Sequence, residues 1–212
     1  MDILIVGAGG HGKVVLDIVK AAGQHRAIGF LDADPALAGA SIHGIPVLGQ
    51  LNLLPKLKSK ARGAIVAIGD NRARAGCAEV LRQHGYELVN AVHPKATVSP
   101  SAGLGASVVI AAGASVGADG RLEDCVIVNT NAVVEHECRI EAAALAGRVS
   151  IGEMAFIGLG SRIIQCLSVG ANSIVGAGAV VITDVPESST VVGVPARVIK
   201  SDAPTRLMAC PA

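Results

Sequence analysis

The sequence predicts a chain in two main parts: an α/β unit with a parallel sheet over residues 1–92 and a parallel β-helix over residues 93–200. A C-terminal tail over residues 201–212 follows. Apolar strands alternate with helical stretches in the first part, and an aliphatic residue recurs at every sixth position after Val98. Hydrophobic residues make up 51% of the 212, yet the chain has two Phe, one Tyr and no Trp. We therefore expect a narrow, regular core of Val, Ile, Leu and Ala.

The composition argues against several classes of protein. Eighteen Lys and Arg residues against 17 Asp and Glu give a net charge of +1, so we expect no nucleic-acid partner. No stretch of 18 or more apolar residues lacks both Gly and a charge, so we expect no membrane insertion. The first ten residues lack the basic region of a signal peptide, and five widely spaced Cys residues without a CxxC pair suit reduced thiols. We expect a cytoplasmic protein without a bound metal.

The elements of the first part follow one another as strand, helix, strand, strand, helix and strand. Val15, Ile18, Val19 and Ala22 share one face of the first helix, and Gly85 closes the second. This alternation predicts a small Rossmann-like unit, long enough for one mononucleotide-binding half but not for a complete dinucleotide fold. The expected spans are residues 2–6, 12–22, 27–32, 64–69, 71–85 and 87–92.

A glycine-rich segment, Gly7-Ala8-Gly9-Gly10-His11-Gly12, stands between the first strand and the first helix. Here glycines let the backbone approach phosphate oxygens, and the free amides at the start of the helix donate to them. Asp32, about twenty residues further on, would suit the ribose of NAD, but the half-sized unit argues against a nicotinamide cofactor. We favour the diphosphate of another nucleotide. His11 either contacts that ligand or is a plain turn residue.

The second part is an internal repeat of six residues. Small residues mostly stand four positions after the aliphatic ones, and this pairing is the hexapeptide signature of a β-helix. Three hexads would form one triangular coil, with the aliphatic side chains stacked inside and neighbouring coils about 4.8 Å apart. The aliphatic positions are Val98, Leu104, Ile110, Val116, Leu122, Val128, Val134, Ile140, Ile151, Ile157, Ile163, Val169, Val175 and Val181.

The outer surface of such a prism indicates whether the protein forms an oligomer. Its coils commonly expose apolar edges that another subunit covers, so we expect a homotrimer. A passive spacer is the alternative interpretation of the repeat.

Several motifs in a fixed order make the chain resemble a known family. They are GAGGHGKVV, FLD, VAIGDNRAR, HPKATVSPSA, VNTNAVVEHEC, LAGRVSIG and VVGVPAR, and they extend over residues 1 to about 200. The chain resembles the sialic acid O-acetyltransferase type of sugar acyltransferase, most of all the acetyl-CoA-dependent N-acetyltransferases of UDP-linked and similar 4-amino sugars in bacterial glycan biosynthesis. The resemblance implies a left-handed β-helix and a homotrimer.

The resemblance assigns the transfer chemistry to two of these motifs. It implies that His136 is the general base, that Glu137 orients it and that Asn129 lies nearby. The chemistry agrees, because an amine sheds a proton as it attacks a thioester and an imidazole with a pKa near neutrality is suited to accept it. A neighbouring carboxylate can fix the tautomer of the ring. A solvated histidine at a corner of the coil is the alternative.

The resemblance also implies two binding sites. For the sugar nucleotide it implies Gly9, Gly10, His11, Gly12, Asp32, Gly69 and Asn71. For acetyl-CoA, the co-substrate, it implies Gly147, Gly176, Gly178 and Arg197. The family often has two acids where this chain has Asp32-Ala33, and two asparagines where it has Asp70-Asn71, so the base and the sugar stay open.

The repeat is interrupted between Ile140 and Ile151, where the spacing is eleven. In the resembling family this stretch is seven residues longer and holds a second histidine that contacts the acetyl donor. We expect the loss of seven residues to turn every later hexad onto the next face of the prism, away from His136. Two interpretations stay open: the chain is truly shortened, which favours an inactive protein, or residues between Ala142 and Ala143 are missing from the sequence.

Three functions are compatible with these observations. The leading hypothesis is acetyl transfer from acetyl-CoA to an amino group, at C4, of a nucleotide-linked amino sugar. The first alternative is O-acetylation of a sugar hydroxyl, which would use the same base. The second is a non-catalytic trimer that only binds the nucleotide sugar.

Overall fold

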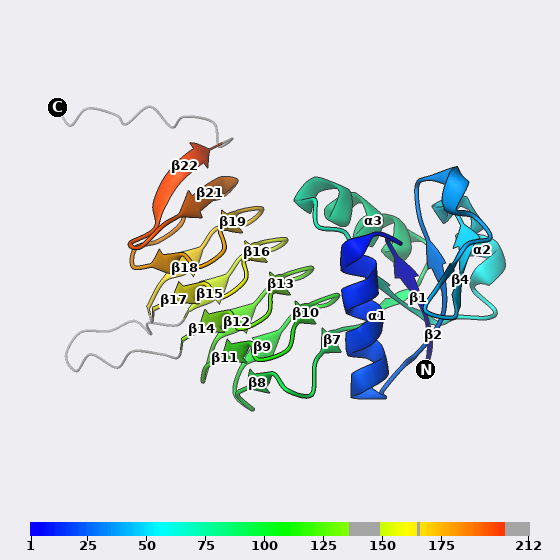
Figure 1. The fold of residues 1–212 in the computed structure, drawn as a ribbon, viewed down its shortest axis with the longest axis horizontal. Coiled ribbons are helices and arrows are strands. Elements are labelled where there is room, and N and C mark those ends of the chain that lie inside the picture. Colours follow the sequence, from blue (N-terminus) through cyan, green and yellow to red (C-terminus); the bar gives the residue numbers. More distant parts are fainter. Residues whose placement is uncertain (136–148, 165, 202–212) are drawn as a thin grey trace.

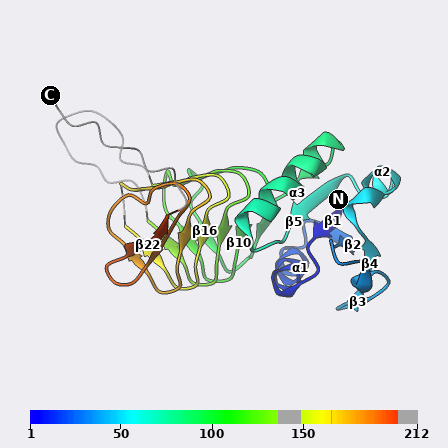
Figure 2. The same ribbon diagram turned by 90° about the horizontal axis from the view of Figure 1, so that it is seen from above.

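The computed structural model covers the chain and describes residues 1–135, 149–164 and 166–201. A sheet with its helices forms the N-terminal body, and a prism of short strands follows it along the length of the molecule (Figures 1 and 2). Of the tail expected over residues 201–212, only Ser201 is among the described residues, and it ends the last strand. No helix in the described ranges has both the length and the hydropathy to cross a membrane.

The N-terminal body is one sheet between two layers of helix. Its elements are β1 Asp2–Val6, α1 Gly10–Ala22, β2 Arg26–Leu31, the 3-10 turn η1 Pro35–Leu37, β3 Ser41–Ile42, β4 Ile45–Gly49, the 3-10 turn η2 Leu51–Leu53, α2 Leu54–Leu57, β5 Gly63–Val66, α3 Asn71–Gln83 and β6 Glu87–Leu88. The sheet order is β3-β4-β2-β1-β5-β6, parallel except where β3 meets β4. Helix α1 packs on the face of Ile3 and Ile5, and α2 and α3 pack on the face of Leu4 and Val6.

The strand expected over residues 87–92 is wrong, because two different sheets share that stretch. Leu88 pairs with Ala64 in the N-terminal sheet, whereas β7 Ala91–Val92 pairs with the first strand column of the prism. Asn90 lies between them, and its side chain donates to Gly105 O at 2.9 Å and accepts from Val108 N at 2.9 Å. These bonds hold the chain to the prism at that point. Residues 33–62, for which we expected no element, contain β3, β4 and α2.

The prism has three parallel sheets, one for each face, plus one antiparallel strand at its C-terminal end. The first face comprises β7, β10 Val109–Ile110, β13 Ile127–Val128, β16 Phe156–Ile157, β19 Ile174–Val175 and β21 Ser189–Val192, with β22 Arg197–Ser201 antiparallel to β21. The second face comprises β8 Thr97–Val98, β11 Ser115–Val116, β14 Val133–Val134, β17 Arg162–Ile163 and β20 Val180–Val181. The third face comprises β9 Gly103–Leu104, β12 Arg121–Leu122, β15 Ser150–Ile151 and β18 Ser168–Val169.

The hexad pattern is confirmed in the core of the prism. The described aliphatic hexad residues are buried, except Val98 and Leu104 of the first coil, which are half-buried. Corresponding residues pair in register from coil to coil, so on each face the aliphatic side chain of one coil lies above the aliphatic side chain of the coil below. The small residues at the fourth position are buried as well, as Ala114, Ala132 and Ala155 show.

The corners of the prism carry a second period of six that the sequence analysis did not use. Most of the described residues three positions after the aliphatic ones adopt positive φ, for example Asp119 at 58°, Asn131 at 56° and Asn172 at 57°. Asn and Asp tolerate this left-handed conformation better than most residues, and Gly adopts it freely. Backbone geometry therefore selects Asn, Asp or Gly at many corners of the coil.

The interruption at residues 140–151 does not rotate the later coils, so that expectation is wrong. Ile151 pairs directly with Leu122 below it and with Val169 above it, on the face that the hexad spacing assigns to Ile140. The other two faces also continue in register across the interruption. With the family's seven extra residues the spacing would be eighteen, which is three hexads, or one whole coil. The shorter spacing of eleven found here and the family's spacing of eighteen therefore lead back to the same face. Residues Ala142 and Ala143 lie outside the described residues.

The N-terminal body is packed firmly against the prism. Helix α1 shares a hydrophobic cluster with Val109 and Ile127 of the first face, and Figure 1 shows the helix between the sheet and the prism. At the end of β5, the buried hydroxyl of Ser107 accepts a hydrogen bond from Val66 N at 3.1 Å. These contacts direct the loops after β1 and β5 toward the coils of the prism.

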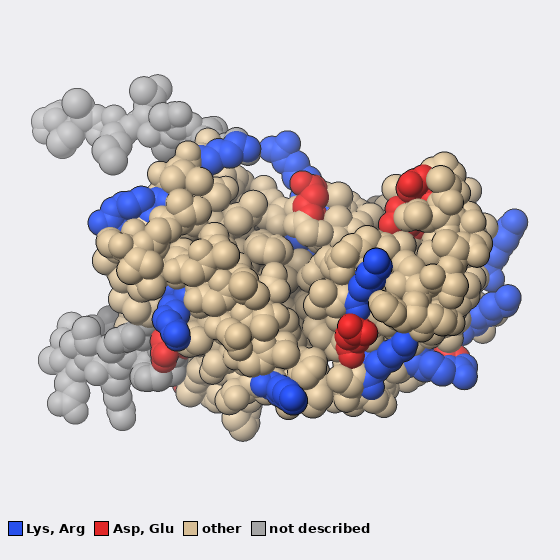
Figure 3. Space-filling view, in the orientation of Figure 1, with Lys and Arg blue, Asp and Glu red and all other residues tan. Residues whose placement is uncertain are grey.

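Charges are sparse on the described surface, and aliphatic side chains are prominent. Figure 3 shows Lys and Arg side chains interspersed with acidic ones, without a continuous basic stripe on that face. Val194 is 73% exposed and Ile199 is 65% exposed. The large aliphatic residues exposed on the prism are Leu159, Ile164, Ile174, Ile182, Val194, Val198 and Ile199.

Candidate active site

The glycine-rich loop after β1 offers free backbone amides to a ligand. Gly9 is the N-cap of α1 with extended backbone, and no side chain caps the helix. A Cβ atom at Gly9 or Gly10 would have no neighbour within 4 Å, so this side of the loop is open. A Cβ atom at Gly12 would lie 2.1 Å from Gly7 O, so there the missing side chain lets the helix close onto the loop. The start of α1 is therefore able to bind an anionic group.

Asp32 braces this loop from the end of β2. One carboxylate oxygen accepts from Ala8 N at 2.7 Å and the other from Asp34 N at 2.9 Å. Hydrogen bonds to a charged acceptor are stronger than neutral ones, so the carboxylate fixes the path of the loop. The sequence analysis assigned Asp32 to the substrate, and the structure places it where it shapes the binding loop.

The loop after β5 forms the second wall of the site. Asp70 caps α3 by accepting from Ala73 N at 2.7 Å, and a Cβ atom at Gly69 would meet nothing within 4 Å. Asn71 is buried, at 7% exposure. Since β1 and β5 are neighbours in the sheet, their two loops meet at its carboxyl edge, where α/β folds bind ligands. The structure thus brings Gly9, Gly10, Gly69 and Asn71 to one edge.

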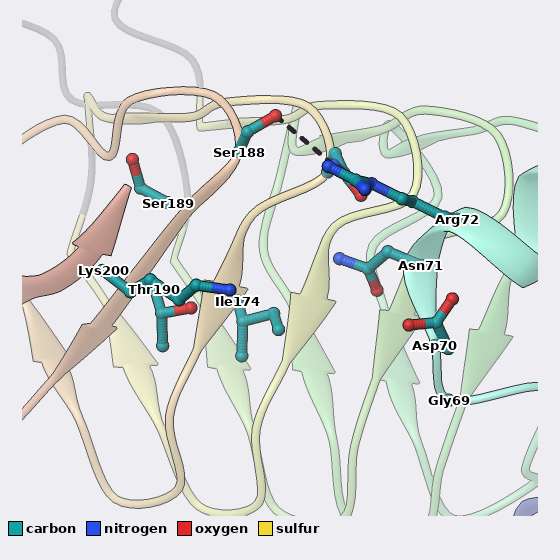
Figure 4. A pocket seen from close by; sticks show the side chains of 10 residues that line it. Gly69, Asp70, Asn71, Arg72, Ile174, Ser188, Ser189, Thr190 and Lys200 are labelled. Carbon is teal, nitrogen blue, oxygen red and sulfur yellow. Dashed lines mark hydrogen bonds between the residues drawn. The ribbon is translucent and has the colours of Figure 1, made fainter. Parts of the chain in front are cut away.

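A cavity of about 260 Å³ lies between this edge and the last coils of the prism. Gly69, Asp70, Asn71 and Arg72 line one side of it (Figure 4). The prism lines the other side, where Asn172 Nδ2 donates to Ser188 Oγ at 3.3 Å. The lining residues from the prism are Asn172, Ile174, Ser188, Ser189, Thr190 and Lys200. The cavity contains hydrogen-bonding groups and two basic side chains, a suitable lining for a polar ligand.

His11 is neutral in the folded protein. Its ring is largely buried, and burial together with the positive charge of Arg74 lowers its pKa to about 4. Its buried Nε2 atom has no hydrogen-bond partner among the described residues. The ring thus presents an unsatisfied nitrogen inside the glycine-rich loop.

A buried neutral histidine makes stability depend on pH. The unfolded chain binds a proton below the ordinary pKa of 6.5, whereas folded His11 binds one only near 4, so stability falls as pH drops through this window. We expect the protein to lose about 2 kcal/mol through His11 between about pH 7.5 and about pH 5. Urea unfolding of the wild type and His11→Gln at both pH values measures this. Equal losses in the two proteins would contradict the assignment.

The sequence analysis did not single out Arg74, which lies in the first turn of α3. Its side chain is fully buried, and burial lowers its pKa to about 10. The guanidinium joins the loop after β5 to two corners of the prism. It donates to Ile68 O at 2.9 Å, Gly69 O at 3.1 Å, Asn71 Oδ1 at 3.0 Å, Cys125 O at 2.8 Å and Met154 O at 2.6 Å. Only the folded structure reveals this role, because two of its acceptors are far away in sequence.

The residues expected to handle the acetyl group are only partly described. His136, Glu137 and Gly147 lie outside the described residues. Asn129 follows β13, and its Oδ1 atom accepts from Thr130 N at 3.1 Å. Gly176 follows β19 on the same face of the prism.

The remaining residues assigned to acetyl-CoA have local structural roles. A Cβ atom at Gly176 would lie 2.7 Å from Val192 Cγ1, so a larger residue here would have to displace the side chain of Val192 in β21. Gly178 has a φ of 68° at a corner, and the exposed Arg197 donates to Ala196 O at 2.9 Å. Their part in donor binding stays a prediction.

No group of three or more His, Cys, Asp or Glu side chains that could hold a metal ion occurs among the described residues. The site consists of backbone amides, hydroxyl and amide side chains, basic side chains, and the carboxylates of Asp32 and Asp70, both of which accept hydrogen bonds from backbone amides. This set of groups is suited to bind a phosphorylated, hydroxylated ligand.

Comparisons with known proteins show a likeness over most of the chain. Residues 2–81 match the family described as the PglD N-terminal domain. GDP-perosamine N-acetyltransferase from Escherichia coli is 30% identical, over 92% of this chain and 95% of that protein.

Two solved structures extend the likeness over both bodies. PerB from Caulobacter crescentus, in complex with CoA and GDP-perosamine, is 44% identical with a TM-score of 0.78, over 94% of this chain and 98% of the other. The acetyltransferase domain of PglB from Neisseria gonorrhoeae, in complex with acetyl coenzyme A, is 40% identical with a TM-score of 0.76, over 93% and 98%. The fold is a Rossmann-like domain followed by a left-handed parallel β-helix. The chain belongs to the family of hexapeptide-repeat sugar N-acetyltransferases.

Proposed function

We propose that the protein transfers the acetyl group of acetyl-CoA to the amino group, at C4, of a nucleotide-linked amino sugar. The observation that carries this proposal is the likeness to PerB over 94% of the chain, since that relative was solved with both CoA and GDP-perosamine. The open amides of Gly9 and Gly10 and the neighbouring 260 Å³ cavity support it. They offer the two kinds of site that a sugar diphosphate needs, one for its phosphates and one for hydroxyl-bearing groups.

The proposed roles divide between the two bodies. The glycine-rich loop binds the diphosphate through backbone amides at the start of α1, with Asp32 holding the loop in place. Gly69 and Asn71 continue this site toward the prism. The prism presents acetyl-CoA, for which the expected residues are Gly147, Gly176, Gly178 and Arg197.

The transfer itself needs one proton acceptor. The amine nitrogen attacks the thioester carbonyl, the C–N bond forms, the C–S bond breaks and CoA leaves as the thiol. His136 accepts the proton that the amine loses and passes it to the departing sulfur, and Glu137 orients the imidazole. The amine must be neutral to attack and the imidazole must be neutral to accept its proton, so protonation of either group lowers the rate at low pH.

The experiment that tests this function is thiol release from acetyl-CoA with a panel of nucleotide sugars. GDP-perosamine is the first substrate to test, followed by UDP-linked 4-amino sugars and their 4-hydroxy counterparts. Turnover only with the amino sugars supports the proposal. Turnover with the hydroxyl compounds identifies an O-acetyltransferase, and nucleotide binding without turnover identifies a non-catalytic binding protein.

We also propose that the protein acts as a homotrimer in the cytoplasm. The exposed Leu159, Val194 and Ile199 on the prism support assembly, because apolar surface of this kind is commonly covered by another subunit. The thiols of Cys77 and Cys125, which form no disulfide, suit a reducing compartment.

The trimer makes a simple prediction. Light scattering is expected to give a mass three times the 21.2 kDa of one chain. Changing Ile199 to Glu places a charge on this apolar surface and is expected to shift the population toward monomers, while Val14→Glu, on helix α1 of the N-terminal body, leaves the mass unchanged. A fully active monomer would contradict the trimer.

A further inference from the structure

Arg74 places a complete set of hydrogen bonds at the junction of the two bodies. A guanidinium has five N–H donors, and each one here has an acceptor. Three of these acceptors belong to Ile68, Gly69 and Asn71, in the loop after β5 and the start of α3. The other two are the carbonyl oxygens of Cys125 and Met154, on successive corners of the prism. One side chain therefore fixes the position of the loop relative to the coils.

The two prism acceptors are themselves part of a rigid ladder. Cys125 and Met154 each have a φ of 58°, and Met154 N donates to Asp124 O at 2.9 Å. Their carbonyl oxygens cannot move without disturbing the corner geometry of two coils. Arg74 thus holds the loop to the prism with little freedom.

No acid forms an ion pair with Arg74 among the described residues, and the nearby Asp70 carboxylate raises the pKa of Arg74 less than burial lowers it. The ion pairs in the described parts of the chain join Arg26 to Asp2 and Arg82 to Asp124, and neither includes Arg74. Burying a cation without a paired anion is costly, and carbonyl dipoles offset only part of that cost. The charge is felt in the glycine-rich loop, where it helps keep His11 neutral. An anion bound at that loop would add negative charge near the buried guanidinium.

We propose that Arg74 is a positioning residue for the nucleotide sugar. It holds the Gly69–Asn71 edge in register with the prism, and its buried positive charge stabilises a diphosphate on the glycine-rich loop without touching it. The inference rests on the proposed function, because it presumes an anionic nucleotide at this edge. It also goes beyond that function, because it predicts that nucleotide binding depends on a residue whose donors are all used within the protein.

Two substitutions separate the geometric role from the electrostatic one. Arg74→Lys keeps the charge but offers a single nitrogen, which cannot reach five acceptors in different directions. Arg74→Gln removes the charge as well. We expect Arg74→Gln to raise the KM for the nucleotide sugar about tenfold or more, with the KM for acetyl-CoA unchanged. Arg74→Lys is expected to retain much of the affinity but to lower kcat, because the edge is no longer held in register.

The same helix provides a matched control. Arg82, in the last turn of α3, also reaches the prism through its ion pair with Asp124, but it is partly exposed and lies away from the loop. Arg82→Gln removes one contact between the bodies and is expected to leave both KM values within about twofold, since exposed ion pairs contribute little. Kinetic constants for GDP-perosamine and acetyl-CoA, with thermal unfolding of each variant, make the comparison.

A second variant keeps the test decisive if Arg74 substitutions fail to fold. Asn71→Asp sets a carboxylate against the guanidinium, where Asn71 Oδ1 now accepts at 3.0 Å, and cancels its charge without opening a cavity. We expect a stable protein with a raised pKa of His11, followed by its ring proton signals in NMR, and this measurement is the decisive one because Asn71 itself belongs to the proposed binding edge. Arg82→Gln is expected to leave that pKa unchanged.

The outcomes distinguish the two levels of the argument. A wild type that neither binds GDP or UDP nor releases thiol with any nucleotide sugar overturns the proposed function. A wild type that does both, with Arg74→Gln and Asn71→Asp matching Arg82→Gln in nucleotide affinity and in the pKa of His11, overturns the role of Arg74 alone.

Discussion

Replacing His136 with Ala is expected to lower kcat for acetyl transfer by about 10²-fold to 10⁴-fold. The reason is chemical, because the amine must lose a proton as it attacks and no other group is assigned to accept it. The KM for the nucleotide sugar is expected to change little, since the imidazole acts in the transition state rather than in binding. Steady-state kinetics with GDP-perosamine and acetyl-CoA measure both constants.

The pH profile gives this prediction a second measurement. In the wild type, kcat/KM is expected to fall at acidic pH as the imidazole and the substrate amine become protonated, and His136→Ala is expected to lose the part of this fall that the imidazole contributes. His84→Ala is a matched control, because His84 is an exposed histidine that caps α3 through Val80 O. It is expected to keep the activity and profile of the wild type. A His136→Ala enzyme within about threefold of the wild type would remove His136 from the mechanism.

Two glycines only two positions apart are expected to respond in opposite ways to the same added methyl group. Gly12→Ala is expected to cost about 3 kcal/mol or more of stability, because its Cβ atom would lie 2.1 Å from Gly7 O and the backbone would have to shift. Gly10→Ala meets nothing within 4 Å at the start of α1 and is expected to stabilise the fold by about 0.5 kcal/mol. Urea unfolding of the two variants checks both signs.

The binding consequence separates the two glycines again. The methyl group of Gly10→Ala projects into the open side of the loop, where we place the diphosphate, so GDP affinity is expected to fall although the fold is intact. Calorimetric titration with GDP measures the loss. Unchanged affinity in a stable Gly10→Ala protein would show that the phosphates bind elsewhere.

The hexad repeat made the prism predictable because each aliphatic side chain stacks on another aliphatic side chain in the next coil. A residue such as Val116 is paired with Val98 and with Val134, each of them three hexads away in the sequence. Counting by hexads failed at the interruption, where it predicted that the later hexads turn onto the next face. Such a count assumes that every residue belongs to a hexad of the coil. The direct pairing of Leu122 with Ile151 shows that the count across this stretch does not determine the face.

The N-terminal body was less predictable where its elements are short. The strands of residues 41–49 and the four-residue helix α2 have too few residues for a hydrophobic period to show. The change of sheet between Leu88 and Ala91 depends on Asn90 bonding to residues 15 and 18 positions away, which no local pattern reports.

The candidate site shows the same division. The glycine-rich loop was visible because its chemistry is local, with a strand, a run of glycines and a helix start in one segment. Arg74 was not visible, because its function comes from acceptors 51 and 80 positions away. In the sequence alone, Arg74 is the second arginine of an Arg-Ala-Arg stretch within a helix.

The direct pairing of β12 with β15 also bears on how such chains diversify. Every change inside a hexad is constrained by the coil above and the coil below, whereas the connection that joins β14 to β15 alters no strand partner on any face when its length changes. We therefore expect insertions and deletions between β14 and β15 to leave the stacking of the three faces intact. Chains of this kind can then differ in the length of this connection while each face keeps the same order of strands.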